Sequence, residues 1–302
     1  MQRLIVAHGS ATLASHLPKL RAVAVYRCDR VLRGGPGKRG VVIMVSSRLL
    51  RVLGSVFASG ALILSGGPAV ACHQHPSARY TCSGGEIPSG TYASITVTGP
   101  CSVATDAVIK VAGDIDVRSG AVFDAQSAPS TITVGRNVIG GAGSLVGLGC
   151  QPPALTGNSA HECAIEPDGY STITVKGSVM AFKADTVLLN GITVNHNVLL
   201  LGGGGDIPWS IKNNTIGGNL TAIGQKPEWL GVLFNHVGGS VRLFRITLHD
   251  VDPGAPGVYV VQNTIGHDLF CAQLDPGVSG GFVPGAVNVV GGHAFGQCKD
   301  LV

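Results

Sequence analysis

Short alternations of apolar and polar residues recur along the chain from about residue 80 and predict short β-strands. One Ile-Thr-Val phrase occurs four times, at residues 95–97, 132–134, 173–175 and 192–194. Because successive side chains of a strand point to opposite faces, each phrase places its Ile and Val on an inner face and its Thr outside. A lone strand of this kind cannot bury its apolar face, so the copies are expected to stack.

A second phrase, in which Asn precedes a short apolar step and one or two glycines, dominates the later part of the chain. It occupies residues 214–220, 235–241 and 263–269, with a shorter copy at 288–292 and an early echo at 137–141. Asparagines at equivalent places of stacked strands hydrogen-bond side chain to side chain, and the glycines beside them allow the positive φ of a sharp corner. The predicted corner asparagines are Asn137, Asn214, Asn235, Asn263 and Asn288.

The spacing of these phrases is that of one coil of a solenoid. Copies at Val175, Val194, Asn214 and Asn235 are separated by 19, 20 and 21 residues. We predict an all-β chain, a single-stranded right-handed parallel β-helix of about ten coils of roughly 20 residues. Two loops, at residues 149–168 and 250–257, interrupt the pattern. A β-sandwich, whose strands also recur at short intervals, is the alternative.

Composition agrees with short strands joined by tight turns. Glycine supplies 45 of the 302 residues, whereas charged residues make up only 13% and aromatic residues 5%. The net charge of +4 averages two unlike segments, because residues 1–71 hold ten Lys or Arg and one acid, whereas residues 72–302 hold 11 basic and 16 acidic residues. Since the predicted folded part is mildly acidic, a nucleic-acid partner is not expected.

The segment at residues 44–71 has the features of a signal peptide. Two arginines precede an apolar run at residues 52–64, and Ala69 and Ala71 offer small side chains for cleavage. A membrane-spanning helix needs about 20 apolar residues, so we expect export rather than a stable membrane span. Residues 1–43 are interpreted as an over-extended start outside the fold, and residues 72–302 as the repeat domain. The expected location is secreted or at the cell surface.

The cysteine spacing predicts local disulfides, as in exported proteins. Six cysteines allow 15 pairings, and the three local pairs are the simplest choice. A zinc site is disfavoured because there is no Cys-x-x-Cys or Cys/His cluster at ligand spacing. A further cysteine, Cys72, would be free or paired elsewhere; lipid attachment there is an alternative that the preceding Ala69 does not favour. The predicted pairs are Cys82–Cys101, Cys150–Cys163 and Cys271–Cys298.

Three features together resemble a group of exported actinobacterial proteins of unknown function. They are the Tyr-Thr-Cys-Ser-Gly-Gly stretch at residues 80–85 followed by Ile-Thr-Val-Thr-Gly at 95–99, the repeats of the Asn-Thr-Ile-Gly-Gly type, and the Gly-Gln-Cys ending at 296–298. The resemblance covers roughly residues 72–302. It implies secretion and a repeat fold but no activity. His267 stands where the group has glycine, which affects one turn.

Candidate chemistry is sparse. Asp114 and Asp116 alternate on one strand, and with Asp124 they are candidates for Ca²⁺ binding, although a solvated face is the simpler interpretation. The segment holding His249, Asp250 and Asp252 is the nearest thing to a general acid–base group, but it lies in a Pro- and Gly-rich turn.

Two further sets have competing interpretations. Three histidines, His236, His267 and His293, fall near equivalent repeat positions and would form a metal-binding or pH-sensitive column at equal phase. Trp209 and Trp229 would present a sugar-stacking surface or simply pack in the core. The sequence thus predicts no cofactor and favours a non-catalytic structural or surface-interaction protein that binds an extracellular polymer or cell-envelope component. A carbohydrate-active enzyme, a polysaccharide lyase or glycoside hydrolase, is the alternative.

Overall fold

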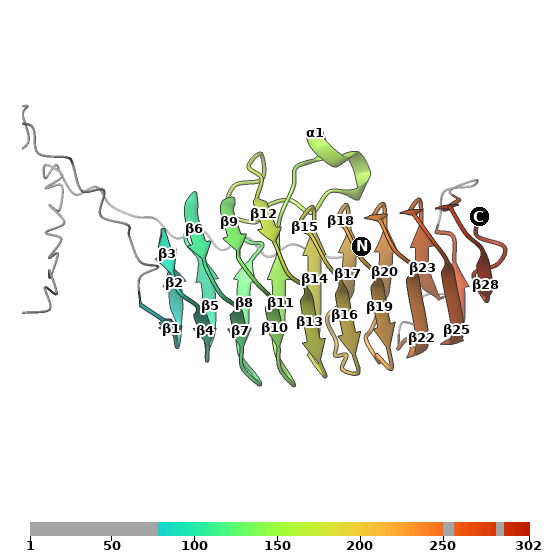
Figure 1. The fold of residues 1–302 in the computed structure, drawn as a ribbon, viewed down its shortest axis with the longest axis horizontal. Coiled ribbons are helices and arrows are strands. Elements are labelled where there is room, and N and C mark those ends of the chain that lie inside the picture. Colours follow the sequence, from blue (N-terminus) through green and yellow to red (C-terminus); the bar gives the residue numbers. More distant parts are fainter. Residues whose placement is uncertain (1–77, 250–256, 282–286) are drawn as a thin grey trace, which may run out of the picture. The chain divides into compact units, whose positions relative to one another are not determined.

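The computed structural model describes residues 78–249, 257–281 and 287–302, and in these the chain forms a parallel β-helix (Figure 1). Three parallel sheets, here called A, B and C, run along the stack. The chain visits the sheets in that order, so each coil contributes one strand to every sheet. The predicted fold is confirmed. The β-sandwich alternative is wrong, because neighbouring strands in all three sheets are parallel.

The strands are short, as the alternations predict. Sheet A contains β1 (Tyr80–Cys82), β4 (Ile95–Val97), β7 (Ile115–Val117), β10 (Val138–Gly140), β13 (Val179–Phe182), β16 (Val198–Leu201), β19 (Leu220–Ile223), β22 (Val241–Thr247), β25 (Leu269–Asp275) and β28 (Ala294–Gly296). Sheet B contains β2 (Gly85–Ile87), β5 (Pro100–Val103), β8 (Val122–Ala125), β11 (Leu145–Leu148), β14 (Thr186–Asn190), β17 (Trp209–Lys212), β20 (Leu230–Leu233), β23 (Val258–Val261) and β26 (Val278–Ser279). Sheet C contains β3 (Gly90–Tyr92), β6 (Ala107–Val111), β9 (Ser130–Val134), β12 (Thr172–Val175), β15 (Thr193–Val194), β18 (Thr215–Ile216), β21 (His236–Val237), β24 (Thr264–Ile265) and β27 (Val289–Val290).

The apolar interior consists of columns of side chains, mostly aliphatic, and each column is formed by residues that lie in register on successive strands of one sheet. In sheet A, Ile95, Ile115, Val138, Val179 and Val198 lie in register and are each at most 1% exposed. Sheet C follows the predicted alternation, with Ile and Val buried and Thr outside. The four Ile-Thr-Val phrases are not one repeat, however. The copy at 95–97 is in sheet A, whereas the other three lead into or form strands of sheet C.

A ladder of buried asparagines occupies the corner between sheets B and C. The Nδ2 atom of Asn214 donates to Oδ1 of Asn235 at 3.0 Å, that of Asn235 to Asn263 at 3.0 Å, and that of Asn263 to Asn288 at 2.8 Å. All four side chains are at most 3% exposed. Each Oδ1 also accepts a backbone N–H from the coil before, and each Nδ2 donates its second proton to a backbone carbonyl. The buried amides are thus satisfied without water.

The grouping of Asn137 with these asparagines is wrong. Asn137 immediately precedes β10 of sheet A and lies at the corner between sheets C and A, where it is half-buried. The Asn-Val-Ile-Gly-Gly phrase at 137–141 therefore runs along sheet A, whereas Asn214 is followed by β18 of sheet C. The two phrases have similar sequences but occupy different sheets of the coil.

The predicted reason for the corner glycines also needs correction. Positive φ occurs at the residues before three of the four buried asparagines, namely Asn213, Phe234 and Gln262, with φ of 58°, 56° and 49°. The glycines that follow have no positive φ. Glycine is required there by close stacking, because a Cβ on Gly238 would lie 2.5 Å from the carbonyl oxygen of Gly217 in the preceding coil.

All three predicted disulfides are present: Cys82–Cys101, Cys150–Cys163 and Cys271–Cys298. The first and last are in the terminal coils. The middle one closes the predicted loop after β11, which contains α1 (Pro153–Thr156) and the 3-10 helix η1 (Gly157–Ser159). No helix among the described residues is long and apolar enough to cross a membrane. The predicted signal peptide and Cys72 lie outside the described residues.

Candidate functional site

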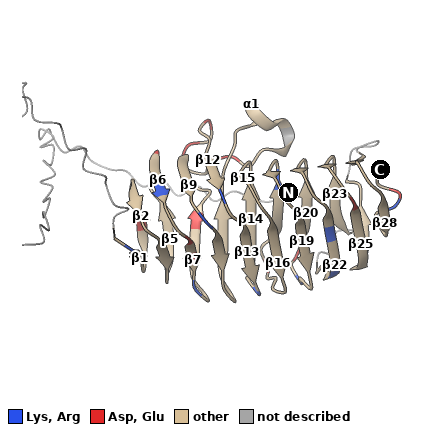
Figure 2. Cartoon of the chain, in the orientation of Figure 1, with Lys and Arg blue, Asp and Glu red and all other residues tan. Residues whose placement is uncertain are grey.

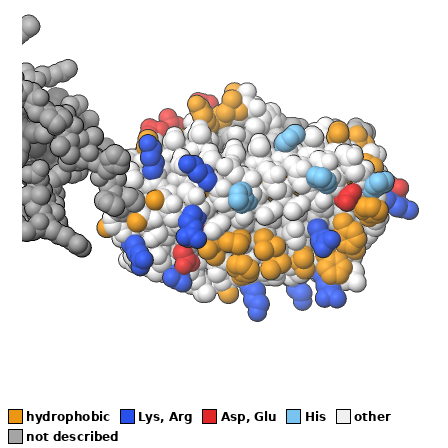
Figure 3. Space-filling model, in the orientation of Figure 1, with side chains coloured by type: hydrophobic (Ala, Val, Ile, Leu, Met, Phe, Trp, Pro, Cys, Tyr) orange, Lys and Arg blue, Asp and Glu red, His pale blue; other side chains and the backbone are white. Residues whose placement is uncertain are grey.

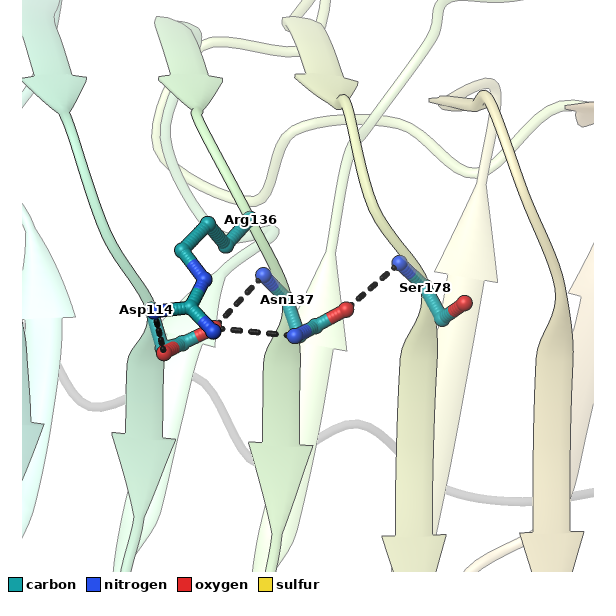
Figure 4. Close-up of polar contacts among 4 residues, drawn as sticks. All are labelled: Asp114, Arg136, Asn137 and Ser178. Atoms are coloured by element: carbon teal, nitrogen blue, oxygen red, sulfur yellow. Dashed lines mark hydrogen bonds and ion pairs between the residues drawn. The ribbon is translucent and has the colours of Figure 1, made fainter.

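The aspartates predicted as calcium ligands make separate contacts on the outer side of the stack. Asp116 forms an ion pair with Arg118 at 3.0 Å. Asp114 Oδ1 accepts hydrogen bonds from the backbone N and Nδ2 of Asn137 at 2.9 and 3.0 Å, and Arg136 lies 3.9 Å from Oδ2 (Figure 4). Asp124 lies in a different sheet, in β8. Within the described ranges, no three His, Cys, Asp or Glu residues are grouped to hold a metal ion.

Asp114 instead begins a second polar ladder, along the corner between sheets C and A. In this ladder a side-chain oxygen of one coil accepts the backbone N–H of the next, as Asn137 Oδ1 does from Ser178 N at 3.0 Å (Figure 4). The same contact is repeated to the last coil. This ladder holds neighbouring corners together, so Asp114 has a structural role. Its later members are Ser178, Asn197, Asn219, Ser240 and Asp268.

The remaining predicted site residues do not converge. His249 is exposed, and its backbone N donates to Pro227 O at 3.1 Å. Asp250 and Asp252 lie outside the described residues, so the structure does not describe the suggested acid–base group.

The suggested histidine column is wrong. His236 is on the outer face of β21, whereas His267 lies in the corner that follows sheet C in its coil. His293 is one residue further along the repeat than His267, and its backbone N–H donates to the Asp268 carboxylate. Trp209 is likewise no surface residue. It is fully buried, and its Nε1 donates to Asp185 O at 2.7 Å.

A groove lies between sheet C and the segment that follows Cys163. It encloses about 330 Å³. Three carboxylate residues, Asp106, Glu166 and Asp168, line it together with the exposed Tyr170. This arrangement has no local signature in the sequence, because Asp106 is about 60 residues from the other two.

The disulfide-closed loop lies against the outer face of sheet B. Lys212 Nζ donates to Ala160 O at 2.8 Å, and Asn213 Nδ2 donates to Ser159 O at 3.1 Å. Burial lowers the pKa of His161, and the nearby Lys212 charge lowers it further, while Asp124 acts in the opposite direction. Burial also lowers the pKa of Lys212. The docked loop therefore favours a neutral His161.

We expect acid to loosen this loop. Above the ordinary His pKa of about 6.5, His161 is neutral whether the loop is docked or open, so pH has no effect. Below it, the open loop takes up a proton before the docked loop does, and docking weakens as pH falls. Hydrogen exchange of residues 151–163, corrected for intrinsic rates, should show less protection at pH 5.5 than at pH 7.5. H161Q should remove that difference; an unchanged pH response in H161Q would contradict the assignment.

An apolar stripe runs along the outer face of sheet A and is here called the sheet A patch. Its side chains lie in register on adjacent strands, for example Phe182 beside Leu201 and Leu201 beside Ile223. Phe182 and Phe295 are 41% and 47% exposed. Figure 3 shows hydrophobic side chains gathered in its lower half, where sheet A lies in Figure 1. The patch comprises Met180, Phe182, Leu199, Leu201, Ile223, Phe244, Phe270 and Phe295.

Cations accompany this patch, although charged residues are few along the stack (Figure 2). The Arg242 guanidinium lies 5.6 Å from the centre of the Phe270 ring, and that of Arg245 lies 5.0 Å from the centre of the Phe244 ring. Lys183 directly follows Phe182, the last residue of β13, and is exposed. The sequence contains a local signal for this patch. The runs at residues 179–182 and 198–201 are apolar throughout, where alternation predicts polar outer positions.

No protein family matches the sequence, and comparisons with curated proteins and with solved structures find no significant match. The resemblance to exported actinobacterial proteins therefore stays a prediction, and the function must be argued from the structure itself.

Proposed function

We propose that the chain is exported and acts without catalysis, binding a component of the cell envelope through the sheet A patch. The patch carries the proposal, because large contiguous apolar surfaces on folded proteins mark interaction sites. Three disulfides support export, since such bonds persist in oxidising compartments. The predicted signal peptide at residues 44–71 supports it as well.

The fold suits binding over an extended surface. Neighbouring strands of a sheet are about 4.8 Å apart. The six sheet A strands β13, β16, β19, β22, β25 and β28 therefore present a face roughly 24 Å long. The two polar ladders and the buried columns hold these strands in fixed register. A pre-ordered face loses little conformational entropy on binding, which favours affinity.

The test compares two double substitutions that each remove two exposed apolar side chains. F182S/F295S changes the patch, and V108S/V289S changes sheet C, where the two valines are 51% and 63% exposed. We expect the patch variant to lose about tenfold in affinity for the isolated cell envelope, because it forfeits the burial of two phenyl rings. The sheet C variant should bind like the unchanged protein.

Both variants should keep the circular dichroism spectrum and melting temperature of the parent, which shows that the fold is intact. Equal binding by the parent and both variants, or equal loss in both variants, would remove the patch from the function.

A carbohydrate-active enzyme is the second candidate, favoured by the groove that Asp106, Glu166 and Asp168 line. Paired carboxylates perform general acid and base catalysis in most glycoside hydrolases. Incubation with pectin-like and alginate-like polymers tests this directly. Release of reducing or unsaturated ends by the parent, and its loss in D168N and E166Q, would support the enzyme. Absence of any product would leave the binding function.

A further inference from the structure

We infer that the envelope component bound by the sheet A patch is an anionic lipid surface, into whose interfacial region the patch inserts. This inference rests on the proposed function and names its partner. It depends on the chemistry of the patch, on the charges around it, and on the poor fit of the other occupants.

The patch side chains are those that favour hydrocarbon. They are aliphatic, thioether or phenyl groups, and the outward row from Met180 to Phe295 is interrupted by Thr221 and Arg242. A sugar polymer presents hydroxyl groups that need hydrogen-bond partners, and a face of Leu, Ile, Met and Phe supplies almost none. Phenyl and leucyl side chains next to basic residues are instead typical of proteins that lie in the membrane interface.

The cations supply the preference for negative charge. Among the described residues, Lys183, Arg242 and Arg245 form no ion pair, while Arg118 and Arg136 do. They lie within or next to the patch, although residues 72–302 hold more acids than bases, 16 against 11. Long basic side chains lay their stems along apolar surface and keep their charges at the headgroups, and each is worth about 1 kcal/mol near an anionic membrane.

The C-terminal end of the patch is hollowed next to a cation. A depression of about 180 Å³ is lined by Arg242, Phe270, Phe295 and Asp268. The Asp268 carboxylate already accepts the backbone N–H of His293 at 3.0 Å. Arg242 is the cation at this hollow that a headgroup phosphate would contact, and the Asp268 carboxylate stays bound to the backbone of the next coil.

A second copy of the chain fits the patch less well. Face-to-face packing of two copies would bury the three patch cations of each copy, and the Asp268 carboxylate that lines the hollow would compensate only part of that charge. Burying uncompensated charge costs several kcal/mol per ion. At a bilayer surface the same cations stay hydrated beside anionic groups.

The experiment measures co-sedimentation with large unilamellar vesicles of phosphatidylcholine alone or with 40 mol% phosphatidylglycerol. The protein is recovered from expressing cells, and its N-terminus is determined by mass spectrometry so that all variants are compared in the same form. We expect at least tenfold stronger partitioning into the anionic vesicles, weakening as salt is raised. F182S/F295S should lose about tenfold on anionic vesicles, and R242Q/R245Q should lose most of the preference for them.

The control V108S/V289S should partition like the parent protein. Envelope binding that depends on Phe182 and Phe295 without vesicle binding would overturn the lipid inference and leave the proposed function standing. Light scattering that shows a dimer dissociated by F182S/F295S would assign the patch to a second copy instead. Loss of neither envelope nor vesicle binding in F182S/F295S would overturn both proposals.

Discussion

Replacing Asn235 by alanine is expected to lower the free energy of unfolding by about 3 kcal/mol, since it leaves buried polar groups without partners. Its Nδ2 donates to Asn263 Oδ1 at 3.0 Å and to Ile211 O at 2.8 Å. Its Oδ1 accepts from the backbone N and Nδ2 of Asn214 at 3.1 and 3.0 Å. A cavity in the middle of the ladder cannot supply these bonds. Denaturant unfolding followed by circular dichroism measures the loss.

The matched control is N219A in the second polar ladder, at the corner between sheets C and A, where Asn219 is exposed. Asn219 Oδ1 accepts the backbone N–H of Ser240 at 2.8 Å, but water replaces such a bond at an exposed corner. We expect a loss below about 1 kcal/mol. Because each coil contacts only its neighbours, hydrogen exchange should show the effect of N235A concentrated in the adjacent coils. Equal losses in N235A and N219A would mean that burial of the ladder contributes nothing.

The second large effect is expected at Trp209. W209A should destabilise the protein by about 4 kcal/mol, because it opens a cavity in a close-packed interior and removes the bond from Nε1 to Asp185 O. Trp229 provides the comparison. It is half-buried on the outside of sheet B, where its ring centre lies 5.0 Å from that of Tyr259.

W229A should therefore cost about 1–2 kcal/mol, the loss of one aromatic contact and part of its burial. Thermal and denaturant unfolding of both variants measure the difference. A smaller loss in W209A than in W229A would contradict the placement of Trp209 inside the stack.

The coil length, the three disulfides and four of the five corner asparagines could be predicted from the sequence because each has a local signature. A spacing of 19 to 21 residues sets the coil, and cysteines that are close in sequence meet in adjacent strands or one loop. The position of a phrase around the coil has no such signature. Asn137 and Asn214 begin nearly identical phrases, but a positive-φ residue directly precedes only Asn214, and the strands that follow lie in sheets A and C, respectively.

The positive-φ corners themselves could not be placed from the sequence. Those corners are formed by residues such as Phe234 and Gln262, at which a positive φ is not expected from residue type. The sheet A patch was missed for a different reason. The prediction assumed that outer positions are polar, so Phe182 and Leu199 were not assigned to a surface. Only strand register shows that such residues from six coils form one face.

The stacked glycine column at Gly217, Gly238, Gly266 and Gly291 has a consequence for the history of the gene. Each coil meets the one before it through the same contacts, so duplication of a coil creates no new kind of neighbour. Recombination that adds one repeat would lengthen the exposed face by about 4.8 Å and leave the packing of the interior unchanged. The reach of this surface is therefore set by repeat number, a quantity that unequal crossing-over changes readily.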